Sequence, residues 1–293
     1  MPVYLWLALI AAVGYSLNSL FIKQALAEGC DRRWLPPAML APPGILLLPA
    51  VFLGGPWPAP TALWQPLLAS FFFLSGTLLT QNALRGGDVS LVGPLMGLKP
   101  VITALLLASL LRQPPPPVTW VAAALCALAL FVMRTPNVMN SSSFLKTLLL
   151  SAGASTSFSL CDLTFQRFAA SWPVMRFTAI AFLLAFGWSL FLVPSIPSRW
   201  RDIPRLARRH TIIAALCIMI TVVCMAFAIG RYGHAAEVNV MYSSRALWTI
   251  VIVWLLGRHI GNREHTGGRS ILIRRTAGAA LLIASIVLVV AFS

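Results

Sequence analysis

The segment Gly93-Pro-Leu-Met-Gly-Leu-Lys-Pro100 lies inside a long apolar run and contains two prolines, two glycines and a lysine. Proline removes a backbone donor and glycine loosens a helix, so we predict a helix break here. A charge at bilayer depth costs at least about 2.5–3.5 kcal/mol, so Lys99 needs a reason to be there. This broken stretch is the feature around which the rest of the chain is interpreted.

The composition is that of a membrane protein. Of the 293 residues, 59% are hydrophobic and only 10% are charged, with a mean hydropathy of +0.85. Soluble domains carry about 25% charged residues. Apolar blocks of about 18–24 residues match the length of helix that crosses a bilayer. We therefore predict an all-α integral membrane protein with ten transmembrane helices, at about 4–27, 36–53, 61–81, 89–111, 117–133, 144–168, 173–193, 210–230, 235–257 and 271–291.

The two halves of the sequence repeat. Arg85, Lys99 and Arg112 recur at one fixed offset as Arg231, Arg245 and Arg258. We predict a first five-helix repeat at residues 1–134 and a second at 135–293, inverted because five spans is an odd number. The pseudo-axis would then place Lys99 and Arg245 on opposing walls of one cavity. Span nine has no proline, so a break is predicted firmly for span four only, and an intact helix stays open for span nine.

The net charge of +15 is explained mainly by topology. Most Lys and Arg residues follow odd-numbered spans, and cytoplasmic connections carry the excess of positive charge. This bias predicts both termini outside and no nucleic-acid partner. The five cysteines show no CxxC pattern, which argues against a disulfide framework or a metal site.

Ten spans in two repeats, with a proline-centred span four, resemble the drug/metabolite transporter superfamily, specifically EamA-type permeases. The resemblance is carried by Asn82-Ala-Leu-Arg-Gly-Gly87, Leu98-Lys-Pro-Val-Ile-Thr-Ala-Leu-Leu106 and Trp120-Val-Ala-Ala-Ala-Leu-Cys-Ala-Leu-Ala-Leu130. The chain departs from the family where Arg112-Gln113 and Arg258-His259 replace an acidic residue, and where Gly14-Tyr15 replaces a Trp-Gly pair. Its charge placement is similar to that of the phosphate-translocator branch, which has a cation on span four and another on span nine.

The candidate substrate-binding residues surround the two intramembrane cations. Lys99 and Arg245 would hold a phosphate or carboxylate, the alternative for Lys99 being a structural ion pair. The polar run at 239–245 adds further candidates. Asp162 is either a proton-coupling group or the counter-charge of a cation. The remaining candidates would line the cavity or simply pack between helices; they are Asn239, Tyr242, Ser243, Trp248, Asn18 and Tyr15.

We therefore predict a secondary transporter of a small organic solute, anionic or zwitterionic, that works by alternating access. The sequence contains no P-loop, Gly-x-Ser-x-Gly or His-Glu-x-x-His motif, so we expect no cofactor, metal or enzyme activity. Two alternatives remain open: an exporter of amino acids or amphipathic metabolites, and a flippase for a lipid headgroup. A membrane-embedded lipid-modifying enzyme would need clustered acids or histidines. Expected partners are the substrate, membrane lipid, and a coupling proton or counter-substrate. The expected location is the bacterial inner membrane, as a monomer or homodimer.

Overall fold

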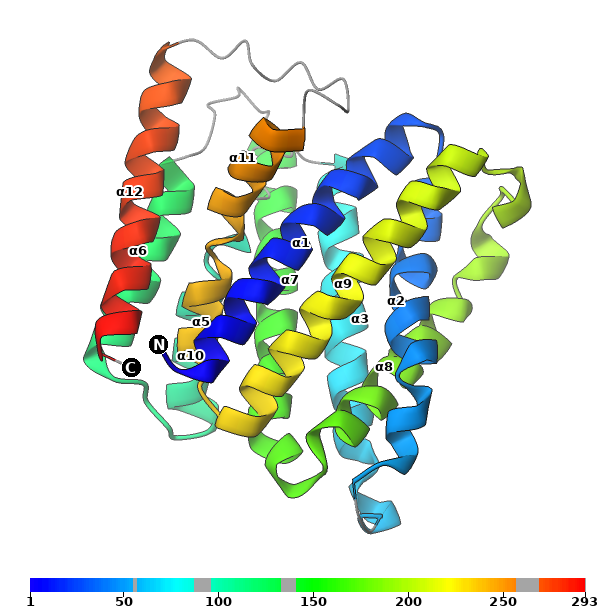
Figure 1. The fold of residues 1–293 in the computed structure, drawn as a ribbon, viewed down its shortest axis with the longest axis horizontal. Coiled ribbons are helices and arrows are strands. Elements are labelled where there is room, and N and C mark those ends of the chain that lie inside the picture. Colours follow the sequence, from blue (N-terminus) through cyan, green and yellow to red (C-terminus); the bar gives the residue numbers. More distant parts are fainter. Residues whose placement is uncertain (55–56, 87–95, 133–140, 257–268, 293) are drawn as a thin grey trace.

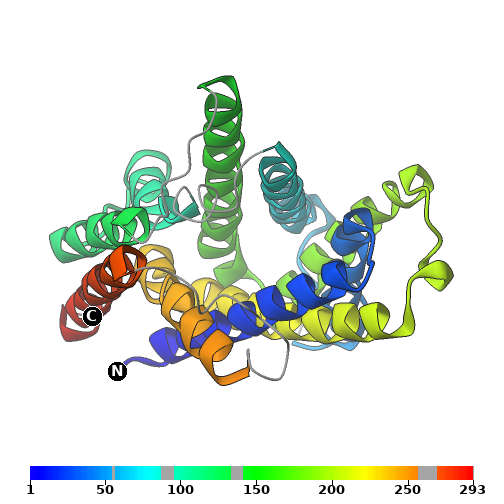
Figure 2. The same ribbon diagram turned by 90° about the horizontal axis from the view of Figure 1, so that it is seen from above.

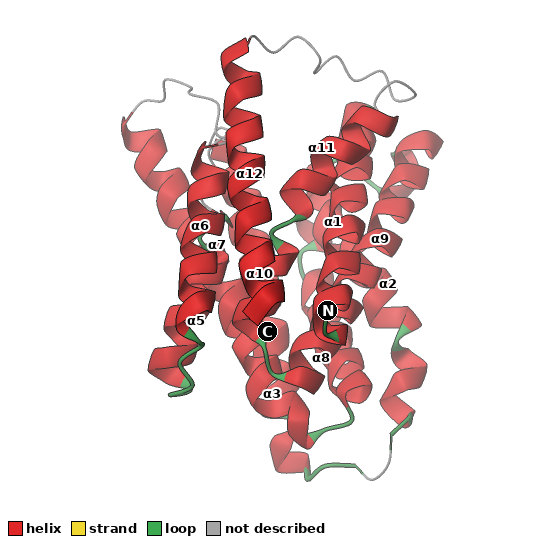
Figure 3. Ribbon diagram, turned by 60° about the vertical axis from the view of Figure 1, so that its left-hand side comes forward, coloured by secondary structure: helices red, strands yellow, loops and turns green. Residues whose placement is uncertain are grey.

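The computed structural model describes residues 1–54, 57–86, 96–132, 141–256 and 269–292. Throughout these residues the secondary structure is helical, with no strand (Figure 3). The α-helices are α1 (Val3–Ala27), α2 (Leu35–Leu46), α3 (Trp64–Gly86), α5 (Lys99–Leu110), α6 (Pro117–Val132), α7 (Ser141–Phe168), α8 (Val174–Leu190), α9 (Arg205–Tyr232), α10 (Ala235–Tyr242), α11 (Arg245–Leu256) and α12 (Arg269–Phe292). Short 3₁₀ turns lie at Arg32–Trp34, Leu48–Phe52, Pro60–Ala62, Ala169–Ser171, Val193–Ser195 and Trp200–Asp202.

Among the described residues, five helical segments are long and apolar enough to cross a membrane. They are Val3–Ala27, Pro60–Ala83, Leu145–Phe168, Val174–Ser195 and Arg205–Tyr232, and shorter apolar helices occur at Lys99–Leu110, Pro117–Val132 and Thr276–Phe292. Large apolar side chains also cover much of the outer surface, among them Phe52, Phe71, Phe191 and Phe292. A surface of this kind is suited to lipid rather than water. The count of ten spans and the inverted relation of the two halves remain predictions, and the predicted boundary at 134/135 lies outside the described residues.

Helices distant in sequence pack along one another. α1 runs beside α9, α3 beside α7, and α12 beside α6 (Figures 1 and 2). The contact between α1 and α9 is close at Gly14, where an added Cβ would lie 2.8 Å from Thr221 Oγ1 and 3.1 Å from the Cys217 carbonyl. Small residues allow such close approach between membrane helices. Gly14 therefore fixes the spacing of this pair.

The predicted break in span four and an unpredicted break in span nine have the same form. α5 begins at Lys99, directly after a turn at Gly97 and Leu98, while Gly93 and Pro94 lie outside the described residues. α10 ends at Tyr242, and α11 begins at Arg245 after a turn at 243–244. An intact helix in span nine is thus excluded.

The break in span nine occurs without proline or glycine. The Ser243 Oγ donates to the Asn239 carbonyl, and the Ser243 backbone N–H is shared between the Asn239 and Val240 carbonyls. Serine side chains compete with the helical backbone for these acceptors, which favours a local change of course.

Candidate functional site

Lys99 is the first residue of α5 and is paired with Asp162 on α7. The Lys99 Nζ lies 2.7 Å from the Asp162 Oδ2. Lys99 is 8% exposed and Asp162 9% exposed, so this is a buried ion pair. The sequence left two roles open for Asp162, and in this arrangement Asp162 is the counter-charge of Lys99. Proton coupling by the same carboxylate stays a prediction.

Asn239 on α10 extends the ion pair. Its Nδ2 donates to the Asp162 Oδ2 at 2.7 Å and to the Ala235 carbonyl at 2.8 Å. Both neighbours are acceptors, so the amide nitrogen must face them and the Oδ1 must face the other way. That Oδ1 is buried and has no hydrogen-bond partner in the described part of the chain. Asn239 therefore holds Asp162 in place and keeps one acceptor unused.

Tyr242 lies between the two cations. The centroid of its ring is 5.9 Å from the Lys99 Nζ and 4.5 Å from the Arg245 Cζ. On its other side the Arg245 guanidinium is 4.7 Å from the ring of Tyr15, which meets Tyr242 edge-on. Cations over aromatic faces gain about 0.5–2 kcal/mol. The ring of Tyr242 therefore links Lys99 to Arg245 without an intervening carboxylate.

We call these residues the central cluster: Tyr15, Lys99, Asp162, Asn239, Tyr242 and Arg245. Among the described residues no carboxylate is paired with Arg245, so the cluster holds two cations against one anion. Both cations also stand at the N-terminal residue of a helix, where the macrodipole adds partial positive charge. Helix N-termini of this kind suit an anionic group. The electrostatics of the central cluster thus favour an anion beside Arg245.

The other candidate residues lie elsewhere or support the backbone. Ser243 stabilises the break through the Asn239 carbonyl. Asn18 ties α1 to α9 by donating to the Ala214 carbonyl, and it also contacts the Met39 Sδ of α2. Trp248 lines an apolar pocket of about 320 Å³ formed with Met1, Leu9, Met241, Ser244, Leu247, Val251, Ile286 and Val290. Asn18 is thus placed as a packing residue, and Trp248 faces a pocket away from the ion pair.

The open cavity predicted between Lys99 and Arg245 stays a prediction. The pockets of about 200 Å³ and 320 Å³ in the described part of the chain are lined by neither cation. Instead the cations, Tyr242 and the Asp162 carboxylate lie in close contact. The side chains of the central cluster therefore interact with one another.

Two polar residues have roles that the sequence did not predict. Arg176 at the start of α8 is 1% exposed. Its Nε donates to the Val51 carbonyl at 2.9 Å, and its guanidinium lies 4.9 Å from the ring of Trp57. Glu237 on α10 joins Tyr4 and His234 in a network. A helix-flanking arginine gives no sequence signal of burial, whereas His234 and Glu237 are spaced as neighbours on a helical turn.

His234 lies just before α10 and takes part in this network. Its Nδ1 is 3.2 Å from the Glu237 Oε2, and its ring stacks on that of Tyr4 at 4.6 Å between centroids. The hydrogen bond to Glu237 raises the pKa of His234 above its ordinary value of 6.5.

Part of this chain matches a known protein family, and nearly all of it matches the fold of a solved protein. Residues 2–135 match the model of the EamA-like transporter family, which confirms the predicted resemblance for that part of the chain. The chain also matches a solved protein whose description, "Crystal structure of protein", names no activity; the TM-score is 0.74 at 16% identity, over 97% of this chain and 95% of the other. At that identity the likeness shows the fold alone. No curated protein matches the chain.

Proposed function

We infer that this integral membrane protein, whose residues 2–135 match the EamA-like transporter family, is a transporter whose central cluster binds the anionic group of a small organic solute. The observation that carries the proposal is the placement of Lys99 and Arg245. Each is the first residue of a helix after a break, and both lie against the ring of Tyr242. Broken helices whose N-termini face a substrate's negative group are a recurrent way of building a transport site.

The charges of the central cluster suggest how binding would proceed. Asp162 neutralises Lys99, whereas Arg245 lies against the rings of Tyr15 and Tyr242 and has no carboxylate partner among the described residues. An incoming phosphate or carboxylate would meet Arg245 first, because a guanidinium accepts such groups with two parallel hydrogen bonds. It would then compete with Asp162 for Lys99. The anion would thereby replace an internal partner, and the cluster would open around it.

Alternating access follows from the same competition. In this conformation Lys99 is paired with Asp162 and lies against the ring of Tyr242, so a solute would have to displace these contacts to bind. Binding of an anion would separate Lys99 from Asp162 and would couple solute occupancy to the relative position of α5 and α7. A ligand shifts such an equilibrium only by its differential affinity for the two states. The exchange of one anion for another is the mode of transport that this arrangement supports most directly.

A second candidate is the export of amino acids or amphipathic metabolites. The Asn239 Oδ1 favours it, since it is a buried acceptor without a partner in the described residues and would suit a donor group on the solute. A lipid-headgroup flippase would use the same cations. The apolar pocket beside Trp248 would then accommodate an acyl chain.

A thermal-shift screen on the purified protein tests the proposal. The panel contains phosphate esters, amino acids and soluble lipid headgroups, each beside an uncharged analogue. A ligand at 100 times its Kd stabilises the folded state by about 2.7 kcal/mol. We expect a charged member to stabilise the wild type, and the shift to be lost in Lys99→Ala and in Arg245→Ala.

Arg231→Gln provides the matched control, because Arg231 is an exposed cation at the end of α9. Its shift should equal that of the wild type. A shift of equal size in both cation variants, or an effect confined to uncharged compounds, would refute an anion site at the central cluster.

A further inference from the structure

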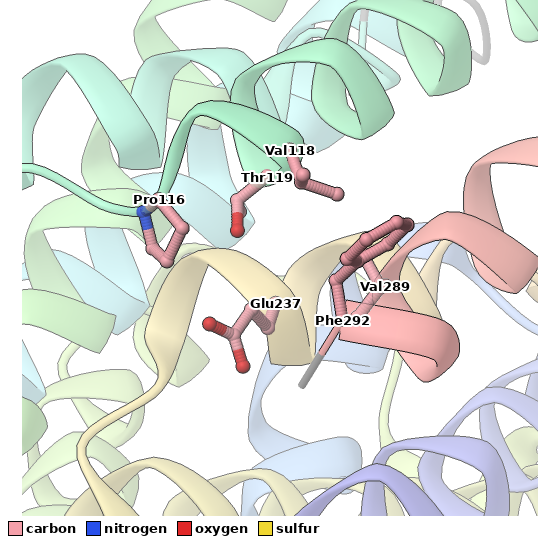
Figure 4. A pocket seen from close by; sticks show the side chains of 6 residues that line it. All are labelled: Pro116, Val118, Thr119, Glu237, Val289 and Phe292. Atoms are coloured by element: carbon pink, nitrogen blue, oxygen red, sulfur yellow. The ribbon is translucent and has the colours of Figure 1, made fainter.

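A second polar site lies at one end of the bundle, apart from the central cluster. A pocket of about 200 Å³ is formed where the start of α6, α10 and the end of α12 meet (Figure 4). Its lining residues are Pro116, Val118, Thr119, Glu237, Val289 and Phe292. Four of these are apolar, and the polar groups come from Thr119 and Glu237. Figure 4 shows the Glu237 carboxylate directed into the space below α6.

The two oxygens of Glu237 are used differently. Its Oε2 accepts a hydrogen bond of 2.7 Å from the Tyr4 hydroxyl and lies 3.2 Å from the His234 Nδ1. No hydrogen bond or ion pair within the described chain reaches its Oε1. Glu237 is only 7% exposed, and it lines the pocket. A buried carboxylate with one unused oxygen strongly favours a partner that brings positive charge and a donor.

The chemistry of the pocket selects among cations. Hard metal ions such as Ca²⁺ take 6–8 oxygen ligands, whereas the side chains here supply one carboxylate and one hydroxyl. The ammonium group of an organic amine needs fewer acceptors than a metal ion. The alkyl chain of the amine can pack on Val118 and Val289. The ring of Phe292 adds a face suited to a cation. We propose that this pocket binds the ammonium group of a small organic amine, with Glu237 Oε1 as its acceptor.

This site does not depend on the proposed anion site. Glu237 and Asn239 lie two residues apart on α10, and residues at that spacing point to different sides of a helix. Asn239 faces Asp162, whereas Glu237 faces α6 and α12. One short helix would thus contribute to an anion site and to a cation site. A substitution in one site can be tested for its effect on the other.

The experiment is a calorimetric titration of the purified, full-length protein with n-butylammonium, beside n-butanol as the uncharged analogue. We expect saturable binding of the ammonium and none of the alcohol. Glu237→Gln should weaken the binding by about tenfold or more, because it keeps the acceptor for Tyr4 and removes the charge. Val118→Trp, a substitution at a partly exposed wall, should block the pocket and give the same loss without touching the carboxylate.

Two control variants show whether the binding of butylammonium depends on Glu237 itself. Glu28→Gln removes the other histidine-paired carboxylate, which contacts His210 at 2.8 Å, and should leave the affinity for butylammonium unchanged. The double variant Lys99→Gln/Arg245→Gln should also leave it unchanged, whatever it does to anions. Absence of saturable binding to the wild type, or equal affinity in Glu237→Gln, would overturn the amine site.

Discussion

Lys99 and Arg245 occupy the same place in their helices, since each is the first residue after a two-residue turn that interrupts a longer apolar segment. The two residues differ in what holds them. Lys99 has a carboxylate at 2.7 Å, whereas Arg245 lies against the rings of Tyr15 and Tyr242. Within the described residues a carboxylate thus neutralises Lys99, and none pairs with Arg245.

Removing the counter-charge should destabilise the fold and strengthen anion binding. In Asp162→Asn the buried Lys99 loses its partner, and breaking a buried pair in this way costs about 3–5 kcal/mol. The same change removes the competitor of an incoming anion. Thermal denaturation should show a lower midpoint and, with the stabilising anion from the screen, a larger upward shift than the wild type gives.

The double variant Asp162→Asn/Lys99→Gln controls for this effect. It has no unpaired charge at this position and should recover much of the lost stability. If Asp162→Asn alone were as stable as the wild type, the ion pair would not contribute as the structure implies.

The ring of Tyr242 should matter more than its hydroxyl. Tyr242→Leu removes the aromatic face that both cations contact, with an expected loss of about 0.5–2 kcal/mol. Tyr242→Phe keeps that face and should lose less. Chemical denaturation of both variants measures the difference. A larger loss in Tyr242→Phe than in Tyr242→Leu would contradict a role through cation–π contact.

The network of His234 and Glu237 should make stability depend on pH. The hydrogen bond to Glu237 raises the pKa of His234, so its contribution to stability is complete below about pH 6.5 and is lost as the pH rises through the raised pKa. The effect should be small, because the His234 side chain is 47% exposed. Melting temperatures between pH 6 and 9 should fall in the wild type and stay flatter in His234→Gln and in Glu237→Gln. An identical pH profile in all three proteins would exclude this linkage.

A methyl group at Gly14 should separate α1 from α9. Its Cβ would meet Thr221 Oγ1 at 2.8 Å and the Cys217 carbonyl at 3.1 Å. Overpacking of this kind costs about 1–3 kcal/mol. Gly187 on α8 is the matched control, because nothing lies within 4 Å of a Cβ added there. We expect a lower melting temperature for Gly14→Ala and none of that loss for Gly187→Ala; equal effects would contradict the close contact.

Much of the fold could be predicted from apolar block lengths and from helix-breaking residues. The cation at Lys99 and the turn before it follow from sequence, because a charge, a glycine and a proline are all informative inside an apolar run. The break at Ser243 and Ser244 could not be predicted in the same way. Serine interrupts a helix only when its hydroxyl finds a competing carbonyl, here that of Asn239, and this depends on the packed structure.

The site was harder to predict than the fold for a related reason. The repeat in the sequence gives Lys99 and Arg245 equivalent positions, but it does not show that Asp162 neutralises Lys99 or that Asn239 donates to Asp162. Asn18 and Trp248 have the same kinds of side chain as the residues of the central cluster, yet Asn18 contacts a neighbouring helix and Trp248 lines an apolar pocket. The residue type shows that a position in a span is polar. The rotation of the helix about its axis decides which neighbour that side chain faces.

The most direct measurement is uptake, into proteoliposomes, of the anion that stabilises the wild type in the thermal screen. Wild type, Arg231→Gln and Lys99→Gln/Arg245→Gln are reconstituted at equal protein content, with the vesicles preloaded with the same unlabelled anion. We expect time-dependent uptake of labelled anion by the first two proteins and only background leak in the double variant. Uptake by Lys99→Gln/Arg245→Gln at the wild-type rate would contradict the claim that these two cations hold the transported anion.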